Sequence, residues 1–347
     1  MRAEGVPVRE DFGFDLLSVE VARWPRMDAL GAYALCRGRG DFADMYVCEI
    51  PPGSRTSPQR HLYEAVVYVL SGRGSTTLDA PEGKRSFEWR EGSLFALPLN
   101  ARYQHFNGSG QKPARFAAVT DLPLVFNVFR SESFIFENEA TFPERFGDAR
   151  YNEGDGRLIP RAPGRHIWET NFVPDLRTLE LKRWDERGGG SSNIVFALAD
   201  GTMHAHISEM PVGTYKKAHR HGADFHVFTV SGHGYSLYWH EGDPDFKRFD
   251  WKFGSVFTPT DMLFHQHFNT GGEPARYLAI AFGGMRYPTV ADKRKTFEGM
   301  DKSMKAGGRQ IDYEDEDPRI RQIFENELRR RGVRSGMAEV VATTARA

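Results

Sequence analysis

The sequence predicts an all-β protein made of two similar units in tandem. Three observations lead to this prediction. Short apolar segments alternate with glycine-containing turns, one stretch recurs about 160 residues later in the chain, and the composition is rich in turn formers and aromatics. With 35 Gly, 19 Pro and 13% aromatic residues, the 347-residue chain has the composition of a turn-rich β protein with a sizeable core.

Residues 45–120 are expected to form the first β unit. Its apolar segments, MYVCEI, AVVYVL, SLFALP and ARFAAVT, are separated by turns such as Pro51-Pro52-Gly53 and Ser71-Gly72. Strands at this spacing are typical of a β sandwich or barrel. The preceding residues 1–44 are expected to be an N-terminal arm with one or two strands that pack on the first unit.

Residues 201–285 repeat this unit. The aligned pairs are Gly53 with Gly213, Gln59 with His219, His61 with His221, Val66 with His226, Gly72 with Gly232, Tyr103 with His265, His105 with His267, Asn107 with Asn269 and Arg115 with Arg276. Because YQHFN and HQHFN are each followed by a glycine turn and Pro-Ala-Arg, the match indicates a duplication.

Two further segments complete the chain. Residues 121–200 are too long for a bare loop and are expected to carry a helical turn or strands that cover a barrel face. Residues 286–347 are expected to be a helical extension and tail. Apolar residues at 320, 323, 324 and 328 fall on one helix face, Gly332 follows three arginines as a helix end should, and the last residues show no pattern.

The histidines are concentrated in the second unit. Nine of the twelve lie between His204 and His267. His219 and His221, at i and i+2, are expected to share one face of a strand, and neutral imidazole is a good ligand for zinc, copper, iron or nickel. With His226 and His265 they could surround one cation if the chain folds back as a barrel.

These residues resemble the two motifs of the cupin family. Gly213, His219-x-His221, His226 and Gly232 are similar to the first motif, and Gly254, Pro259, His265 and Asn269 are similar to the second. The second motif departs from the family in having Asp261 where a glycine is expected and one extra residue before His265. The resemblance implies two tandem cupin barrels (double-stranded β-helix, or jelly roll), with a degenerate metal site in the first and the metal site in the second.

The resemblance also implies a metal-dependent chemistry. Cupins often have a glutamate at the place of His226, and an all-histidine site is more similar to the gentisate 1,2-dioxygenase and diketone dioxygenase groups than to oxalate decarboxylase. The expected catalytic and metal-binding residues are therefore His219, His221, His226 and His265. The expected cofactor is Fe(II), with Mn(II), Ni(II) or Zn(II) as alternatives.

We expect a mononuclear non-haem dioxygenase that cleaves a C–C bond of a hydroxylated aromatic acid or an enolisable diketone, with O₂ and an anionic small molecule as substrates. One alternative is a redox-neutral isomerase, hydrolase or decarboxylase at the same residues, and another is a bicupin that only binds a small molecule. His267, which recurs as His105, is an alternative ligand to His265 or a group with a structural hydrogen bond. Substrate contacts are expected from His267 and from the aromatic residues Tyr215, Phe228 and Tyr238, although aromatic residues on barrel strands are more often core. His204 and His206 are either exposed or close to the metal ligands.

The remaining features restrict the class of protein. A formal net charge of -1 gives no electrostatic basis for binding nucleic acid or an anionic membrane. The two cysteines, Cys36 and Cys48, do not have a metal-type spacing, and the first residues lack the apolar run of a signal peptide. Nucleotide-binding glycine motifs are absent. A cytoplasmic protein, as the default on these grounds, and a homodimer are the expectations for location and assembly.

Overall fold

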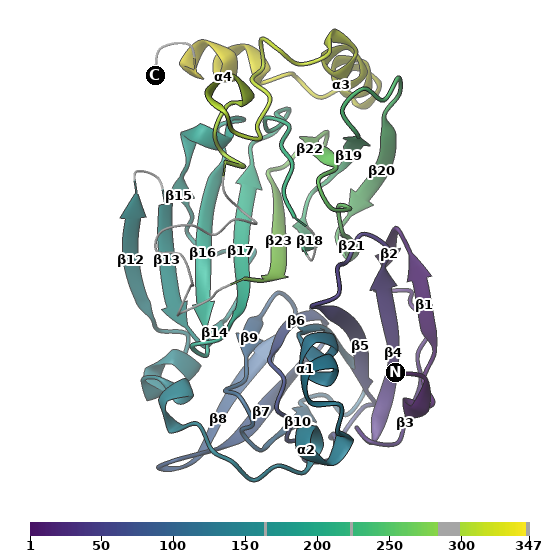
Figure 1. Ribbon diagram of the computed structural model, residues 1–347, viewed down its shortest axis with the longest axis vertical. Coiled ribbons are helices and arrows are strands. Elements are labelled where there is room, and N and C mark those ends of the chain that lie inside the picture. The colour runs from purple at the N-terminus through teal and green to yellow at the C-terminus, as the bar shows by residue number, and fades with distance from the viewer. Residues whose placement is uncertain (163–164, 223–224, 284–298, 345–347) are drawn as a thin grey trace.

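The computed structural model describes residues 1–162, 165–222, 225–283 and 299–344. Figure 1 shows two β barrels stacked along the long axis of the molecule, with the N-terminal half below and the C-terminal half above. Each barrel consists of one large and one small sheet. The all-β prediction with helices near the C-terminus is confirmed.

The first barrel encloses its own apolar core. Its large sheet runs in the order β1 (Val8–Asp11), β4 (Ala29–Cys36), β5 (Asp44–Ile50), β11 (Ala114–Thr120), β6 (Ala65–Ser71), β9 (Leu94–Ala96) and β14 (Phe172–Val173), with β3 (Ala22–Trp24) beside β4. Its small sheet runs in the order β10 (Tyr103–Asn107), β7 (Arg73–Ala80) and β8 (Gly83–Arg90). Buried Phe95, Phe116 and Leu78 belong to the cluster of side chains inside this barrel.

The second barrel repeats this arrangement. Its large sheet runs in the order β12 (Arg157–Ala162), β13 (Arg165–Thr170), β16 (Ser192–Leu198), β17 (Met203–Met210), β23 (Ala275–Phe282), β18 (His226–Ser231), β21 (Ser255–Phe257) and β2 (Gly13–Asp15), with β15 (Lys182–Arg183) beside β16. Its small sheet runs in the order β20 (Lys247–Lys252), β19 (His233–Trp239) and β22 (Phe264–Asn269). Phe225, Val227, Tyr238, Phe257 and Tyr277 belong to its internal cluster.

Each barrel takes an edge strand from outside its own repeat. β2, near the N-terminus, pairs with β21 of the second barrel, and β14, in the connection, pairs with β9 of the first. The segments that follow β2 and β14, here called the crossing segments, are each bound by an arginine at an equivalent position of the repeat. Arg115 donates to the carbonyls of residues 16 and 17, and Arg276 donates to those of residues 176 and 179. The sheets therefore draw on residues outside the ranges 45–120 and 201–285.

The two large sheets pack against each other through a shared apolar core. It combines side chains such as Val66, Tyr68 and Leu70 of β6 with Phe228 and Val230 of β18. Tyr68 and Phe228 are equivalent in the repeat, and their rings meet with centroids 5.7 Å apart. Because these two positions are equivalent in the repeat and contact each other, we infer that an approximate two-fold axis relates the two barrels.

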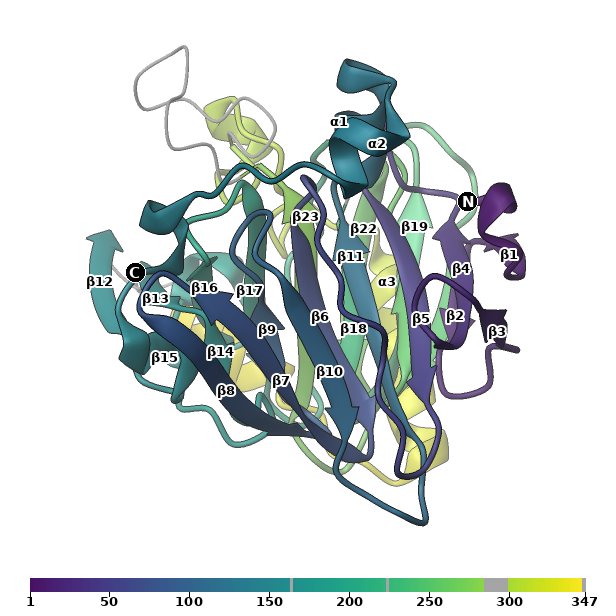
Figure 2. The ribbon, with the colours of Figure 1, turned by 90° about the horizontal axis from the view of Figure 1, so that it is seen from below.

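The helices lie at the ends and edges of the barrels. They are η1 (Arg2–Glu4), α1 (Leu122–Phe129), α2 (Glu132–Phe136), η2 (Pro143–Phe146), η3 (Ala149–Asn152), η4 (Asp185–Arg187), η5 (Met304–Ala306), α3 (Pro318–Arg331) and α4 (Met337–Thr344). Figure 2 shows α1 and α2 at one end of the first barrel's strands. Within the described residues, no helix is both long and apolar enough to cross a membrane.

The C-terminal extension packs on the second barrel. α3 begins with the Asp317 side chain accepting a hydrogen bond from the backbone of residue 319, and it ends at Gly332 in the left-handed region. Its buried Ile320, Phe324 and Leu328 pack against the outer face of the small sheet, which confirms the predicted apolar face. The patternless tail forms the short helix α4. The first part of the predicted extension, residues 286–298, lies outside the described residues.

Candidate metal centre

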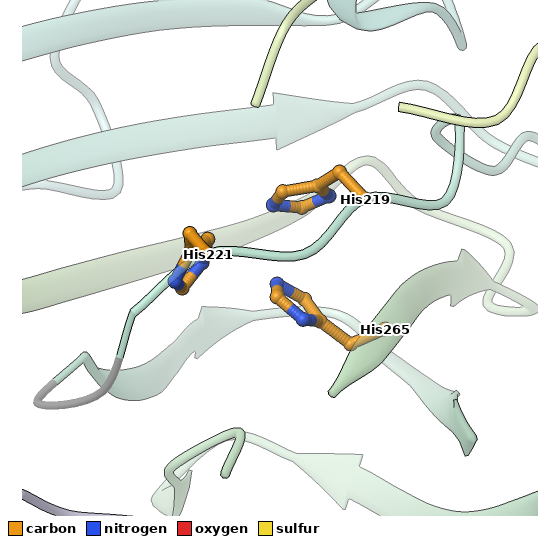
Figure 3. A group of neighbouring side chains, drawn as sticks. All are labelled: His219, His221 and His265. Atoms are coloured by element: carbon orange, nitrogen blue, oxygen red, sulfur yellow. The ribbon is translucent and has the colours of Figure 1, made fainter. Parts of the chain in front are cut away.

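Three histidines from two segments of the second barrel face one another. His219 and His221 lie on the segment between β17 and β18, and His265 lies on β22 (Figure 3). The backbones of His219 and His265 are paired, with N–O distances of 3.1 and 2.9 Å in the two directions. One ring nitrogen from each histidine lies within 4.8 Å of the others, so the group could hold a metal ion.

The surroundings of this trio keep the imidazoles neutral. The side chains are buried, and burial lowers the pKa of His221 to about 4 and the pKa values of His219 and His265 well below the usual range. His221 Nδ1 donates to the carbonyl of Gly222 at 2.7 Å, and His265 Nδ1 donates to that of Leu263 at 3.0 Å. Each of these two rings then keeps its lone pair on Nε2, the atom free to bind a cation.

The donor set suits a divalent transition metal. Three neutral nitrogens match the ligand preference of iron, zinc or nickel, and they leave further coordination positions for a substrate. Among the residues that the structure describes, the trio contains no carboxylate ligand, so the site would carry the full charge of the ion.

The equivalent positions of the first barrel are filled by hydrogen-bonded protein groups. His61 Nε2 lies 2.8 Å from the hydroxyl of Tyr103, which occupies the place of His265. Gln59, at the place of His219, accepts a hydrogen bond from Arg26 at 2.9 Å. Within the described residues, no group able to hold a metal is found in this barrel.

Comparison with known proteins identifies the fold. Residues 46–120 match the family model described as the cupin domain. Among solved structures, an oxalate decarboxylase–formate complex from Lactobacillus farciminis is 15% identical, with a TM-score of 0.51 and coverage of 79% of this chain and 87% of that chain. A variant of oxalate decarboxylase from Bacillus subtilis is 16% identical, with a TM-score of 0.50 and coverage of 80% and 78%.

The chain has the two-barrel fold of a bicupin. A third structure, from a study of the Mn(II) centres of Bacillus subtilis oxalate decarboxylase, is 16% identical, with a TM-score of 0.51 over 80% of this chain and 79% of that chain. At such identities the likeness concerns the fold. No curated protein sequence matches the chain.

His226 was expected as a ligand, but the structure does not bring it into the trio. It is fully buried on β18, on the same side of the strand as Phe228 and Val230, because side chains two residues apart share a face. Those two residues pack in the core between the barrels, as does Val66, the repeat partner of His226. The pattern of His at positions 219, 221 and 226 therefore combines residues from two environments.

His267 lies inside the second barrel, two residues after His265 on β22. Its Nδ1 is 2.7 Å from Ser236 Oγ, which also accepts a hydrogen bond from Trp251 Nε1 at 3.0 Å. The first barrel repeats this arrangement: His105 Nδ1 is 2.8 Å from Thr76 Oγ1, which accepts from Trp89. The alternative of a structural hydrogen bond common to both halves is thus present, and His265 rather than His267 belongs to the trio.

The three expected aromatic contacts lie in three different places. Tyr238 is inside the second barrel and is paired in register with His265. Tyr215 lies on the outer side of the small sheet, where it packs against Phe324 of α3 and donates to Glu316. Phe228 faces the core between the barrels. Of these three, Tyr238 is therefore the one that shares the barrel interior with the trio, because the other two rings pack against neighbouring elements.

Sequence reasoning missed two buried cations close to the trio. Arg187, at the end of η4 in the connection, approaches both ring nitrogens of His219 at 2.8 and 3.0 Å. Lys216 lies three residues before His219, and its Nζ donates to the hydroxyl of Tyr277 at 2.9 Å. Comparing the repeats could have found Lys216, because Lys216 and Tyr277 align with Thr56 and Phe116 in the first barrel.

The pair His204 and His206 lies near this region, on β17. The facing nitrogens of the two rings are 3.4 Å apart, and the His206 ring is close to Phe225, which in turn contacts His221 with centroids 4.4 Å apart. The pair is therefore linked to the trio through the ring of Phe225.

Proposed function

We propose that this bicupin is a metal-dependent enzyme that breaks a C–C bond in a small anionic substrate at the trio of His219, His221 and His265. The observation that carries the proposal is the convergence of three buried neutral imidazoles from two segments. A bound metal would supply Lewis acidity and, in the case of iron, redox chemistry with O₂.

The protein groups prepare the site for an anion. The imidazoles bring no negative charge, and Arg187 adds a buried positive charge against His219. A carboxylate or enolate that enters would be attracted by this charge in a poorly hydrated environment, where electrostatic interactions are strong. The buried Nδ1 contacts of His221 and His265 fix their ring orientations before the substrate binds.

Two reaction classes share this site, and each is favoured by a different observation. Redox-neutral decarboxylation, with manganese as the metal, is favoured by the fold shared with oxalate decarboxylases and by the Mn(II) centres of the one from Bacillus subtilis. Oxidative cleavage by an iron dioxygenase is favoured by a trio without a carboxylate ligand. We place the decarboxylase first because it agrees with the structural relatives.

Metal analysis and product analysis test the proposal together. Protein purified without oxygen is expected to hold about one transition metal per chain. The His265→Ala variant should lose this metal, whereas His233→Ala, at the start of β19 and outside the trio, should retain it. Wild-type protein without metal would contradict the proposal.

Turnover then separates the reaction classes. CO₂ release from a small carboxylic acid without net oxygen uptake would indicate the decarboxylase, and stoichiometric oxygen uptake with hydroxybenzoates or diketones would indicate the dioxygenase. A metal-loaded protein that binds such acids without converting any of them would instead indicate a binding protein.

A further inference from the structure

The second barrel contains two buried cations that have no acidic partner within the described residues. Arg187 and Lys216 are 4% and 1% exposed. Among the described residues, neither side chain forms an ion pair with a carboxylate; Lys216 contacts Tyr277, and Arg187 contacts His219, the Met300 carbonyl and the Gln310 side-chain oxygen. Buried charges are costly unless they are paired, so this arrangement needs an explanation.

Other buried or half-buried cations of the chain are paired. Arg115 and Arg276 pair with Glu49 and Glu209 at 2.8 and 2.6 Å. Lys217, the neighbour of Lys216, points to the other side of its segment and pairs with Asp312 at 2.9 Å. The chain therefore supplies carboxylates to buried cations elsewhere.

The internal repeat shows that this charge is specific to the barrel with the trio. In the first barrel the places of Lys216 and Tyr277 are taken by Thr56 and Phe116, which carry no charge. The arginine there, Arg26, is paired with Glu4 at 2.9 Å. When the described residues of the two barrels are compared, the unpaired cations thus belong to the barrel that contains the three histidines.

Tyr277 connects the two cations. Burial raises the pKa of its hydroxyl, but the charges of Lys216 and Arg187, together with hydrogen bonds from Lys216 and Ser208, lower it by more, so the net shift is downward. Its ring lies beside His267, with centroids 5.1 Å apart, and the Lys216 ammonium lies 4.8 Å from the ring centroid. The hydroxyl and the ammonium are therefore held together inside the barrel.

We propose that Lys216, Tyr277 and Arg187 form a carboxylate-binding position distinct from the metal ligands, and that the substrate is accordingly a small dianion, such as a dicarboxylate or an ionised hydroxy acid. One end would bind at the trio and the other would accept hydrogen bonds from Lys216 Nζ and the Tyr277 hydroxyl. The second binding position rests on the proposed function for the location of the first end. A dianion would offset the charge that the protein leaves uncompensated.

Binding of two probe anions tests this inference. Malonate, a dicarboxylate, and acetate, a monocarboxylate, are titrated calorimetrically into the metal-loaded chain. Malonate is expected to bind wild type more tightly than acetate does, and Lys216→Met to weaken malonate binding about 30-fold or more while changing acetate binding little, since losing one partner of a buried charged contact is costly. Tyr277→Phe should weaken malonate binding less, and Lys216→Arg should restore part of it.

Lys217→Met is the matched control, since its side chain lies on the opposite side of the same segment. It should bind malonate as wild type does. Melting temperatures without ligand provide a second readout: Lys216→Met should melt no lower than wild type, because it removes an unpaired buried charge. Equal binding of the two probes by wild type, or unchanged malonate binding by folded Lys216→Met, would overturn the inference.

Repeating the malonate titration with the chain as purified, and measuring its metal content, separates this inference from the proposed function. If the wild-type chain binds no metal but binds malonate in a Lys216-dependent manner, the carboxylate position is supported and the metal-dependent activity is refuted. If metal is bound at one per chain and malonate binding is independent of Lys216, the carboxylate position is refuted while the metal site remains.

Discussion

Two histidines buried in the first barrel should make the protein sensitive to acid. His61 and His105 are 4% and 0% exposed, and burial lowers the pKa of each from 6.5 to about 3. At pH values between about 3 and 6.5, these two histidines bind protons in the unfolded chain but not in the folded chain. The depressed pKa values therefore mean that stability is present above pH 6.5 and is lost as the pH falls toward the folded values.

The size of the effect is set by the shifts. Each histidine costs about 1.4 kcal/mol of unfolding free energy per pH unit, so the pair costs about 2.7 kcal/mol per unit. From pH 6.5 to 4.5 the loss is about 5 kcal/mol, which is similar to the whole stability of a marginal domain. Even half of this value would be measurable.

A variant that cannot titrate isolates this contribution. In His61→Gln combined with His105→Gln, the two protonation equilibria are absent, while the other titrating groups are unchanged. Urea unfolding at several pH values between 7 and 4.5 gives the slope of unfolding free energy against pH for both proteins. We expect the variant, although less stable at pH 7, to lose stability less steeply by about 2 to 3 kcal/mol per unit. Parallel slopes would refute the reasoning.

Three further results are expected. Gln59→His together with Tyr103→His should give the first barrel a trio with His61 and raise the metal content to about two per chain; mass spectrometry showing one would contradict the repeat alignment. Burial raises the pKa of Asp44 to about 6, which costs stability above the unfolded value of 3.8, so Asp44→Asn should gain about 3 kcal/mol relative to wild type between pH 4 and pH 8, and no gain in urea unfolding would count against it. Phe324→Ala, at a fully buried position of α3, should cost about 3–5 kcal/mol, and a melting temperature equal to wild type would show that the extension is not part of the cooperative unit.

The repeat made the fold predictable from sequence. The paired YQHFN and HQHFN segments occupy the equivalent strands β10 and β22, and the apolar spacing at residues 320–328 identifies α3. The helix depends on local apolar periodicity and the two barrels on an internal repeat, and a sequence expresses both directly. The choice of His265 over His267 was also available, because His267 has a histidine counterpart in the barrel without a trio and His265 does not.

Other parts of the site depend on contacts that local patterns do not express. Whether His226 faces the barrel interior or the other barrel depends on which face of β18 is covered, and the valine at position 66 was the available clue. Arg187 reaches His219 from a connection with no motif of its own. The exchange of edge strands could have been predicted from a second sequence similarity. DLLSVEVARWP at 15–25 is similar to DLRTLELKRWD at 175–185, so the duplication extends into both crossing segments.

The exchange of edge strands also determines how the chain can fold during synthesis. The first barrel cannot complete its large sheet until β14, at residues 172–173, has been made, and β2 cannot pair until β21 has been added at residues 255–257. β2 is thus left with an open edge while most of the chain is translated, and such edges favour association with other chains. Maturation should accordingly be slow and late, and a ribosome-stalled chain ending before residue 255 should be a client for chaperones.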